Sequence, residues 1–562
     1  MIQSDQESVK KILKRRDTLM ERRGQFMSHW EDLSQVMLTR REGFSSTTVD
    51  GDHRNEDLYD GTPMQGARSL ANTTGAMIRP EGEVFVRIGT QDSKVEQDEE
   101  AAIWLADSTE RLDAAIRNPK ARFRQATGEV DLDLVVFGTG ILFAGLSQTR
   151  ENLLFKSVHL KNGIPFFNDE GHAVGMFLDA DMMIWQAVEK FGADKLHPKT
   201  QELITKGKID NKIRIVHAVV PREQQRFSNP KLSKNFPLAD MWIELEHNHL
   251  IKSGGFEEFP FVVPRWNTSS GEDYGRSPGM IALPDSNTLQ AMGETLLVAA
   301  QRAADPPLMV PEDGAFNEIN TFPGGISYYS ADSAAALNGR NPFFPLVTGL
   351  NLPITRDMQG DIRTQVMNAF FKNILNLPVG GPEMTATEII QRKDEFIREV
   401  GPVFGIFETD YNQPLAERSF NTMLRNGGFL PIPEVLAGQE VKFNFELPVT
   451  KVRKQVIAAA ARQWALEQME LAQTDPSHAH IVNKEALARF SHKALGLPIE
   501  IISSKSQYEE KLNADREAAA AQNRKQMESS TADTLQKGAG AIKDLAGLGE
   551  GAEGLTKQLQ GA

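Results

Sequence analysis

The chain has 562 residues, of which 40% are hydrophobic and 25% are charged, as expected of a globular protein with roughly two to four domains. It contains no cysteine, which excludes disulfides, thiolate nucleophiles and cysteine-ligated zinc. The 76 acidic and 62 basic residues give a net charge of −14, which argues against a protein that wraps nucleic acid in basic surface. The polar N-terminus and the lack of an apolar run of about 18 residues predict a cytosolic-type protein without membrane segments.

The N-terminal segment is predicted to be helical. Residues 1–40 predict one long amphipathic helix, because apolar residues recur at three- and four-residue spacing among lysines and arginines. The basic run at residues 10–16 would suit a membrane or nucleic-acid surface, but the acidic residues around it favour a solvated outer face. Thr62 and Pro63 begin a helix that extends to about Met77.

Helices give way to strands near residue 140. Residues 96–137 predict two helices that are separated at Pro119, because proline cannot continue a helix. Residues 141–265 predict strands, of which 213–220 is a clear example, with a short helix near 181–191. The first half of the chain is therefore predicted to belong to the α+β class.

Two matched helices with a compact insert between them mark the middle of the chain. Residues 285–304 and 354–375 both show regular apolar spacing, and about 20 residues of helix span about 30 Å. The insert, residues 305–352, is rich in proline, glycine and aromatic residues and carries five acidic residues and one arginine. This pattern predicts a rod with a small head.

A long, interrupted helix follows the second rod helix. A glycine- and proline-rich loop ends the rod helix, and Thr385 with Glu388 forms a capping box that begins the next one. Pro402 and Pro414 should kink or break that helix. Its end is predicted at the Asn-Gly-Gly of residues 426–428.

The C-terminal part combines one strand with helices. Residues 440–447 alternate strictly between apolar and polar side chains and predict a strand. Residues 449–526 predict helices broken at Pro476 and Pro498. The Gly/Ala-rich residues 538–562 have little to pack and are expected to order only with a partner.

No pattern in the chain supplies a catalytic, cofactor or metal site. Gly138 and Gly140 follow a helix and precede a strand, the reverse of a dinucleotide-binding fingerprint, so they predict a tight turn. His247 and His249 have no further metal ligand nearby in the sequence, which disfavours a metal site. A phosphate-binding P-loop is also missing. We therefore expect a protein that is not an enzyme and needs no cofactor or metal.

Several ordered segments resemble the head-to-tail connector, or portal, proteins of short-tailed double-stranded DNA bacteriophages. The ordered set is more specific than any of its members, and the match extends from about residue 10 to about residue 515. The segments that carry the resemblance are Asp57-Leu-Tyr-Asp60, Met77-Ile-Arg-Pro-Glu-Gly82, Phe137-Gly-Thr-Gly-Ile-Leu142, Pro264-Arg-Trp266, Tyr274-Gly-Arg-Ser-Pro278, Met384-Thr-Ala-Thr-Glu388, Gly401-Pro402 and Leu430-Pro-Ile-Pro433.

The resemblance implies an α+β portal architecture. Its parts are an α/β wing, a two-helix stem, a small α/β clip, a kinked long helix with a tunnel loop, and a helical C-terminal crown. The implied boundaries are 1–282 for the wing, 283–304 and 353–377 for the stem helices, 305–352 for the clip, 378–433 for the tunnel loop and kinked wing helix, 434–530 for the strand and crown, and 531–562 for a flexible tail.

The resemblance also implies a function without catalysis. A ring of about twelve copies would form a channel at one capsid vertex, through which double-stranded DNA is packaged and ejected. Its implied partners are the terminase large subunit, then tail adaptor or tail tube proteins, and the major capsid and scaffold or internal core proteins. The protein would be made in the host cytoplasm and reside in the virion, without a membrane. The alternative is another internal virion core or scaffold protein without a DNA channel.

Candidate functional residues follow from the implied parts. Those for the DNA channel are Arg356, Arg363, Lys372, Val379, Gly380, Gly381, Glu383, Arg392 and Lys393. Those for docking of the terminase or the tail adaptor, in the clip, are Glu312, Asp313, Phe316, Glu318, Tyr328, Tyr329 and Arg340. The basic residues have an alternative role, which is an ion pair between subunits with Asp357, Asp361 or Asp394. The acidic excess of the ring would repel DNA and let it slide.

Overall fold

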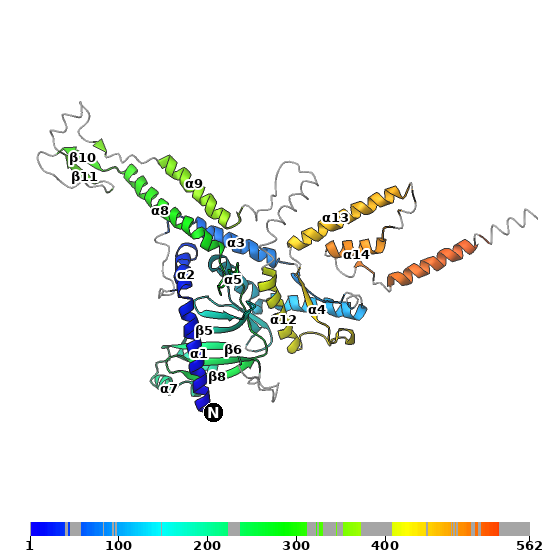
Figure 1. The fold of residues 1–562 in the computed structure, drawn as a ribbon, viewed down its shortest axis with the longest axis horizontal. Coiled ribbons are helices and arrows are strands. Elements are labelled where there is room, and N and C mark those ends of the chain that lie inside the picture. The colour runs from blue at the N-terminus through cyan, green and yellow to red at the C-terminus, as the bar shows by residue number, and fades with distance from the viewer. Residues whose placement is uncertain are drawn as a thin grey trace, which may run out of the picture. The chain divides into compact units, whose positions relative to one another are not determined.

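The computed structural model forms two compact units, residues 1–453 and 454–562 (Figure 1). It combines helices with small sheets, in agreement with the predicted mixed class. The structure describes residues 2–39, 43–44, 58–82, 84–92, 95, 98–147, 149–222, 236–311, 322, 325–329, 344–345, 352–372, 407–445, 448–473, 475, 478, 481–495, 501–503, 507–525 and 527.

The N-terminal segment is two helices rather than the single helix predicted, α1 (Ile2–Arg22) and α2 (Gly24–Met37). The break is at Arg23, whose buried guanidinium donates three hydrogen bonds to main-chain carbonyls of residues 160–163. Gly24, a poor helix former, follows directly. A long-range contact therefore sets a boundary that local periodicity could not predict.

The basic run of α1 is only partly a solvated face. Val9 and Leu13 are buried against the large sheet. Arg16 Nε donates to Asp179 Oδ1 at 2.9 Å, and the Arg15 guanidinium carbon lies 4.2 Å from the centre of the Phe166 ring. These contacts fasten α1 to the sheet, and so two of the basic residues are used within the chain.

Three further helices agree with the predicted positions. They are α3 (Thr62–Ile78), α4 (Glu99–Arg117) and α5 (Phe123–Phe137), with a 3₁₀ turn, η2 (Pro119–Ala121), between the last two. Asp98 caps α4 by accepting a hydrogen bond from the Ala101 N–H. Gly138 ends α5 at φ 80°, which confirms the tight turn predicted there.

Two antiparallel sheets occupy residues 142–262. The smaller has the order β3-β2-β9 and the larger β4-β5-β6-β7-β8. Their strands are β2 (Leu142–Leu146), β3 (Leu153–Ser157), β4 (Gly163–Phe167), β5 (Ala173–Met183), β6 (Lys212–Pro221), β7 (Leu238–Glu244), β8 (His249–Phe256) and β9 (Phe261–Val262). Two short helices, α6 (Ile184–Phe191) and α7 (Pro198–Thr205), connect β5 to β6. The predicted strand region and short helix are thereby confirmed.

The strand predicted at residues 440–447 forms as β13 (Val441–Phe445), and it pairs antiparallel with β1 (Val86–Thr90). Phe443 and Phe445 are buried in the core of the first unit. The pairing therefore ties this part of the chain to the N-terminal region.

The two rod helices are α8 (Pro278–Ala304) and α9 (Leu352–Ala369), and they lie side by side (Figure 1). α8 begins before the predicted residue 285, because Ser277 caps it by accepting from the Met280 N–H, and Pro284 is accommodated inside it. Between the helices, β10 (Leu308–Pro311) pairs parallel with β11 (Ile326–Tyr329) and antiparallel with β12 (Phe344–Pro345).

The remaining helices also follow proline signals. A π-helical turn, η6 (Glu408–Asn412), precedes α12 (Gln413–Arg425), so the predicted interruption at Pro414 is confirmed. A 3₁₀ turn, η7 (Glu434–Leu436), lies before β13. The second unit contains most of α13 (Pro448–Leu471), α14 (Lys484–Leu495) and a helix over residues 507–525. The capping box at 385–388 and residues 538–562 lie outside the described residues.

Aromatic packing joins α2 to the start of α8. Trp30 is fully buried, its indole Nε1 donates to the Phe137 carbonyl at 3.1 Å, and its ring centre lies 5.0 Å from that of Tyr274. The Ser277 hydroxyl, in the cap of α8, donates to the Val136 carbonyl at 2.7 Å. The base of α8 is therefore fixed to α5 and the N-terminal helices.

Candidate functional site

The segment ahead of α3 connects α8 with α9. Arg363 Nε on α9 donates to Asp60 Oδ2 at 2.8 Å. Gln290 Nε2 on α8 donates to the Asp60 carbonyl at 2.7 Å, and Gln290 Oε1 accepts from the main-chain N–H groups of Tyr59 and Asp60, each at 2.9 Å. Asp60 therefore takes part in hydrogen bonds to both helices of the pair, and we call this set of contacts the Asp60 junction.

The carboxylate of Asp60 is suited to this position. Its Oδ1 accepts from the Thr62 N–H at 2.8 Å, at the start of α3. Burial alone would raise the pKa of Asp60, but the hydrogen bonds from Thr62 and the pairing with Arg363 lower this pKa below its ordinary value. The group is therefore ionised at neutral pH, and its charge is matched by Arg363.

Two glycines let the backbones of this region approach closely. An added Cβ at Gly66 of α3 would lie 2.5 Å from Cδ2 of Phe370, a ring that is buried just after α9. An added Cβ at Gly293 of α8 would lie 2.8 Å from Cβ of Tyr59. Both positions require glycine because any side chain would displace the neighbouring element.

The predicted channel cations on α9 have different surroundings. Arg356 and Lys372 are exposed, whereas the half-exposed Arg363 is paired with Asp60 of the same chain. The predicted alternative partners were acidic residues at 357, 361 and 394, so the observed partner of Arg363 was not among them.

Most other predicted site residues lie outside the described residues. For the channel these are Val379, Gly380, Gly381, Glu383, Arg392 and Lys393, and for the clip they are Glu312, Asp313, Phe316, Glu318 and Arg340. Tyr328 and Tyr329 end β11, where the backbone positions pair with Val310 and Pro311 of β10.

The helix pair exposes large apolar side chains. Ile281 is 71% exposed and Leu297 50% exposed on α8, and Met358 is 55% exposed on α9. Single exposed apolar residues are common on proteins, and a helix pair that carries several of them is a candidate for contact with another molecule. This feature defines the pair as a candidate assembly surface.

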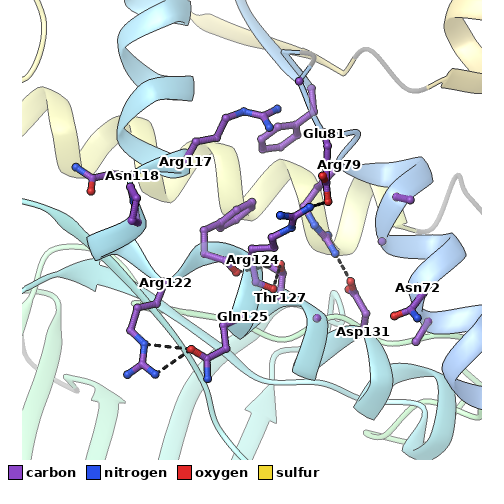
Figure 2. Close-up of a pocket in the computed structure, with 18 residues that line it drawn as sticks. Asn72, Arg79, Glu81, Arg117, Asn118, Arg122, Arg124, Gln125, Thr127 and Asp131 are labelled. Atoms are coloured by element: carbon purple, nitrogen blue, oxygen red, sulfur yellow. Dashed lines mark hydrogen bonds and ion pairs between the residues drawn. The ribbon is translucent and has the colours of Figure 1, made fainter.

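An arginine-lined pocket lies where α3, the end of α4, η2 and α5 meet (Figure 2). Its volume is about 1030 Å³, and its lining includes Arg79, Arg117, Arg122 and Arg124. Arg79 forms an ion pair with Asp131 of α5, and its guanidinium carbon lies 4.6 Å from the centre of the Tyr411 ring. The pocket therefore concentrates positive charge in a chain whose net charge is negative.

The inner wall of this pocket is strongly desolvated. The side chains of Arg79 and Asp131 are 6% and 5% exposed. Burial would lower the pKa of Arg79, but attraction to the Asp131 carboxylate raises it overall, so the arginine stays charged. Burial and the same carboxylate raise the pKa of Tyr411 well above its ordinary value, so the phenol stays neutral.

The sequence analysis did not predict this pocket. Arg117, Arg122 and Arg124 follow one another within a short span around a proline break, which is a usable signal of local positive charge. Nothing in the sequence, however, indicates that they face Arg79 on another helix. The Asp60 junction was missed for the same reason, because its partners lie far apart in the chain.

A group of histidines differs from expectation. Residues 245–248 form the turn between β7 and β8, so His247 lies in the turn and His249 begins β8. His197 also joins them, with its ring centre 4.1 Å from that of His247 and 5.5 Å from that of His249. In the part of the chain that the structure describes, no cluster of three or more His, Asp or Glu side chains is arranged to hold a metal ion.

Among the described residues, none of the helices combines the length and the apolar character that crossing a bilayer would need.

The tied helix pair with its exposed apolar side chains is the feature that points to a protein that assembles with other molecules. The sequence matches the model of the family described as "Bacteriophage head to tail connecting protein" over residues 9–502, so the chain belongs to that family. The predicted head-to-tail connector of a bacteriophage is thereby confirmed. The family's description names a structural connection and no reaction.

Two curated relatives agree with this membership. The chain is 27% identical over 451 residues to a probable portal protein of Bordetella phage BPP-1, covering 79% of each chain. It is 24% identical over 455 residues to a portal protein of Salmonella phage epsilon15, covering 79% of this chain and 80% of the relative.

Solved structures give a more distant likeness. A chain from the virion of a native gene transfer agent particle matches with 12% identity and a TM-score of 0.33, covering 83% of this chain and 99% of that chain. A chain from the neck of the native particle, computed with C12 symmetry, matches with 11% identity and the same TM-score, covering 79% of this chain and 92% of that one. Scores of this size do not establish a shared arrangement.

Proposed function

We propose that about twelve copies of the chain form a ring at one capsid vertex, with a channel through which double-stranded DNA is packaged and ejected. The observation that carries this proposal is the set of exposed apolar side chains on α8 and α9, among them Ile281, Leu297 and Met358. In a ring, the same helices of neighbouring copies would cover them, and burial of apolar area would stabilise the assembly.

The parts of the chain are assigned on the same basis. We assign α8 and α9 to the stem, residues 305–352 to the clip, and residues 378–433 to the tunnel loop and the kinked wing helix. Residues 1–282 form the wing and 434–530 the strand and the helical crown, followed by the tail at 531–562. The β1–β13 pairing adds that the strand at 441–445 completes a sheet of the wing.

The net charge of the chain suits a channel for DNA better than a protein that binds DNA tightly. Each copy carries −14, so a ring repels the DNA phosphates and lets the duplex slide. On α9, Arg356 and Lys372 are exposed and can meet DNA, whereas Arg363 is occupied by Asp60. The glycines at 380 and 381 supply the backbone freedom that a loop pressing on DNA requires.

The partners follow from the position at the vertex. The acidic clip is the docking surface for the terminase large subunit during packaging and for the tail adaptor or tail tube afterwards. The wing faces the major capsid protein and the scaffold or internal core. The protein is made in the host cytoplasm and is then a structural part of the virion, with no catalytic role.

The mass of the purified protein and its image test the ring. Light scattering should give about 750 kDa, which is twelve copies of 62.4 kDa, and negative-stain images of the same peak should show a central hole. A protein that is monomeric alone should assemble when scaffold or capsid protein is added. Compact small oligomers without a hole, or elongated assemblies without a channel, would contradict the proposal and favour an internal core or scaffold protein.

Charge reversal tests the clip. The double substitution Glu312→Lys with Asp313→Lys should weaken binding of the terminase and of the tail adaptor while the ring stays intact. The matched control is Glu509→Lys with Glu510→Lys, which changes the same charge on an exposed helix of the second unit. Unchanged affinity for both partners would contradict the clip assignment.

A further inference from the structure

We propose that the arginine-lined pocket between α3 and α5 binds a phosphate group, presented either by the DNA backbone or by a free nucleotide or inorganic phosphate. The pocket belongs to the wing region and contains none of the residues predicted for the channel or the clip. The inference therefore goes beyond the connector function and does not depend on it.

Charge and donor geometry point to an anion with several oxygens. Arg79, Arg117, Arg122 and Arg124 line the pocket against two acidic side chains, Glu81 and Asp131. Guanidinium groups present parallel N–H donors that match phosphate oxygens, and the pairing is stronger where water is partly excluded. Asp131, Asp113 and Glu81 each pair with one of these arginines, and the four guanidinium groups have more N–H donors than three carboxylates satisfy.

The second observation is an unused donor on a buried side chain. Arg79 is more than nine-tenths buried, and its Nη1 has no hydrogen-bond partner among the described residues. Its Nη2 is taken by Asp131, and Tyr411 packs against the plane of the group. Buried polar groups in folded proteins are almost always paired, so a phosphate oxygen in the pocket would supply the acceptor that Nη1 of Arg79 has the capacity to bind.

The other lining arginines contact neighbouring side chains of the same chain. Arg122 donates to Gln125 Oε1 from Nη2 at 2.9 Å, and Arg117 donates from Nε to Asp113 Oδ2 at 2.8 Å. Arg124 is paired with Glu81 at the rim (Figure 2). Arg122 and Arg124 are exposed, so these contacts orient their guanidinium groups only weakly and leave them accessible to a ligand.

Small residues keep the pocket open. Gly128 lies on the α5 side of the lining, and a Cβ added there would meet nothing within 4 Å.

Phe85 and Phe123 also line the pocket, with stacked rings whose centres are 6.1 Å apart. Apolar rings beside a cationic rim suit a phosphate that carries a sugar and base, since these need an apolar neighbour.

A substitution at Gly128 tests the site without removing a buried partner. Gly128→Glu places a carboxylate in the open space of the pocket, and Gly128→Gln is its neutral control of the same size. Binding of a fluorescently labelled short DNA duplex to the full chain is measured by anisotropy. We expect Gly128→Glu to weaken binding roughly tenfold relative to Gly128→Gln.

A second pair of variants separates the pocket from general charge. Arg122→Gln removes a pocket arginine and should weaken binding several-fold, whereas Arg111→Gln removes an exposed arginine of α4 outside the pocket and should not. Competition then identifies the source of the phosphate. Displacement of the probe by a nucleoside triphosphate or inorganic phosphate indicates a free ligand, and displacement by unlabelled duplex alone indicates the DNA backbone.

Two results would overturn the proposal. One is equal affinity of Gly128→Glu and Gly128→Gln for every phosphate probe. The other is stronger displacement by a short poly-glutamate peptide than by DNA or nucleotides, which would assign the pocket to an acidic protein segment. Ring formation, read by light scattering on the same samples, should be unchanged in all variants, so failure of this inference and failure of the ring proposal are distinguishable.

Discussion

Arg363 and Asp60 meet through a hydrogen bond of 2.8 Å between Nε and Oδ2, although they lie in α9 and in the loop before α3. Asp60 belongs to the Asp-Leu-Tyr-Asp segment that contributes to the family resemblance, and the structure gives this segment a physical role. It holds both rod helices, through Gln290 on α8 and Arg363 on α9. A cation predicted for the channel is thus used to fix the orientation of the helix that carries it.

Substitution at the Asp60 junction should weaken the whole contact. Asp60→Asn removes the charge that Arg363 pairs with and should cost about 1–2 kcal/mol of unfolding free energy. Because Arg363 is 46% exposed, its own contribution is screened by solvent, and the coupling energy in a double-mutant cycle with Arg363→Gln should be about 0.5–1 kcal/mol. Urea unfolding of the variants measures the loss of unfolding free energy and the coupling energy. Purely additive effects of the two substitutions would show that the pair is not coupled. Arg356→Gln, which removes an exposed arginine of the same helix, is the control.

Two glycine-to-alanine substitutions should have opposite signs. At Gly66 the added methyl lies 2.5 Å from the buried Phe370 ring, so Gly66→Ala should destabilise by about 1–3 kcal/mol. At Gly360 in α9 nothing lies within 4 Å, so Gly360→Ala should stabilise by about 0.5–1 kcal/mol through helix propensity. Thermal unfolding of the two variants checks this. Wild-type stability of Gly66→Ala would contradict the close approach of α3 to Phe370, and a loss of stability in Gly360→Ala would contradict the open space around Gly360.

The sequence predicted elements well where the signals are local. Pro63 at the start of α3, the Gly138 turn and the Pro414 interruption all act within a few residues, and each appears where it was expected. The strand at 441–445 was equally predictable, because apolar and polar residues alternate there with a period of two, which differs from the 3.6-residue period of a helix.

Features that depend on distant residues could not be predicted. The break at Arg23 exists because the carbonyls near residue 160 accept its hydrogen bonds, and periodicity carries no trace of them. The partner of β13, the pairing of Arg363 with Asp60, and the gathering of four arginines into one pocket are also long-range events. The start of α8 is different, because Ser277 and Pro278 are a local cap signal that the predicted start at residue 285 did not use.

The pH dependence of stability should include a contribution from His217. Burial lowers the pKa of His217, although its Nε2 lies 2.6 Å from Asp240 Oδ1, and its ring stacks on Trp242 with centres 3.9 Å apart. A folded pKa below the unfolded value of about 6.5 means that the contribution is fully present above that value and is lost as the pH falls through the folded pKa.

Unfolding free energies at about pH 7.5 and pH 5.5 test this contribution. The wild type should lose more stability between the two values than His217→Gln, because the variant has no imidazole to protonate in the core. His172→Gln, at an exposed position, should show the wild-type loss. The same pH-dependent loss in His217→Gln and in the wild type would contradict a neutral, buried His217.

Arg23 should be intolerant even of lysine. Its Nη1 donates to the carbonyls of Leu160 at 3.0 Å and Gly163 at 2.8 Å, and its Nη2 donates to that of Lys161 at 2.7 Å. Burial lowers the pKa of Arg23, but a guanidinium titrates at so high a pH that it stays charged. A lysine side chain ends in a single ammonium group. This group cannot reach all three carbonyls that the two terminal nitrogens of Arg23 contact.

Arg23→Lys should therefore leave buried carbonyls unsatisfied and cost about 2–4 kcal/mol. Hydrogen exchange should also become faster at the amides of residues 160–163, because the turn loses its anchor. Arg22→Lys, one residue earlier and exposed, should change neither quantity. If Arg23→Lys kept wild-type stability and exchange, the break between α1 and α2 would not depend on this guanidinium, and the glycine at position 24 would have to account for it alone.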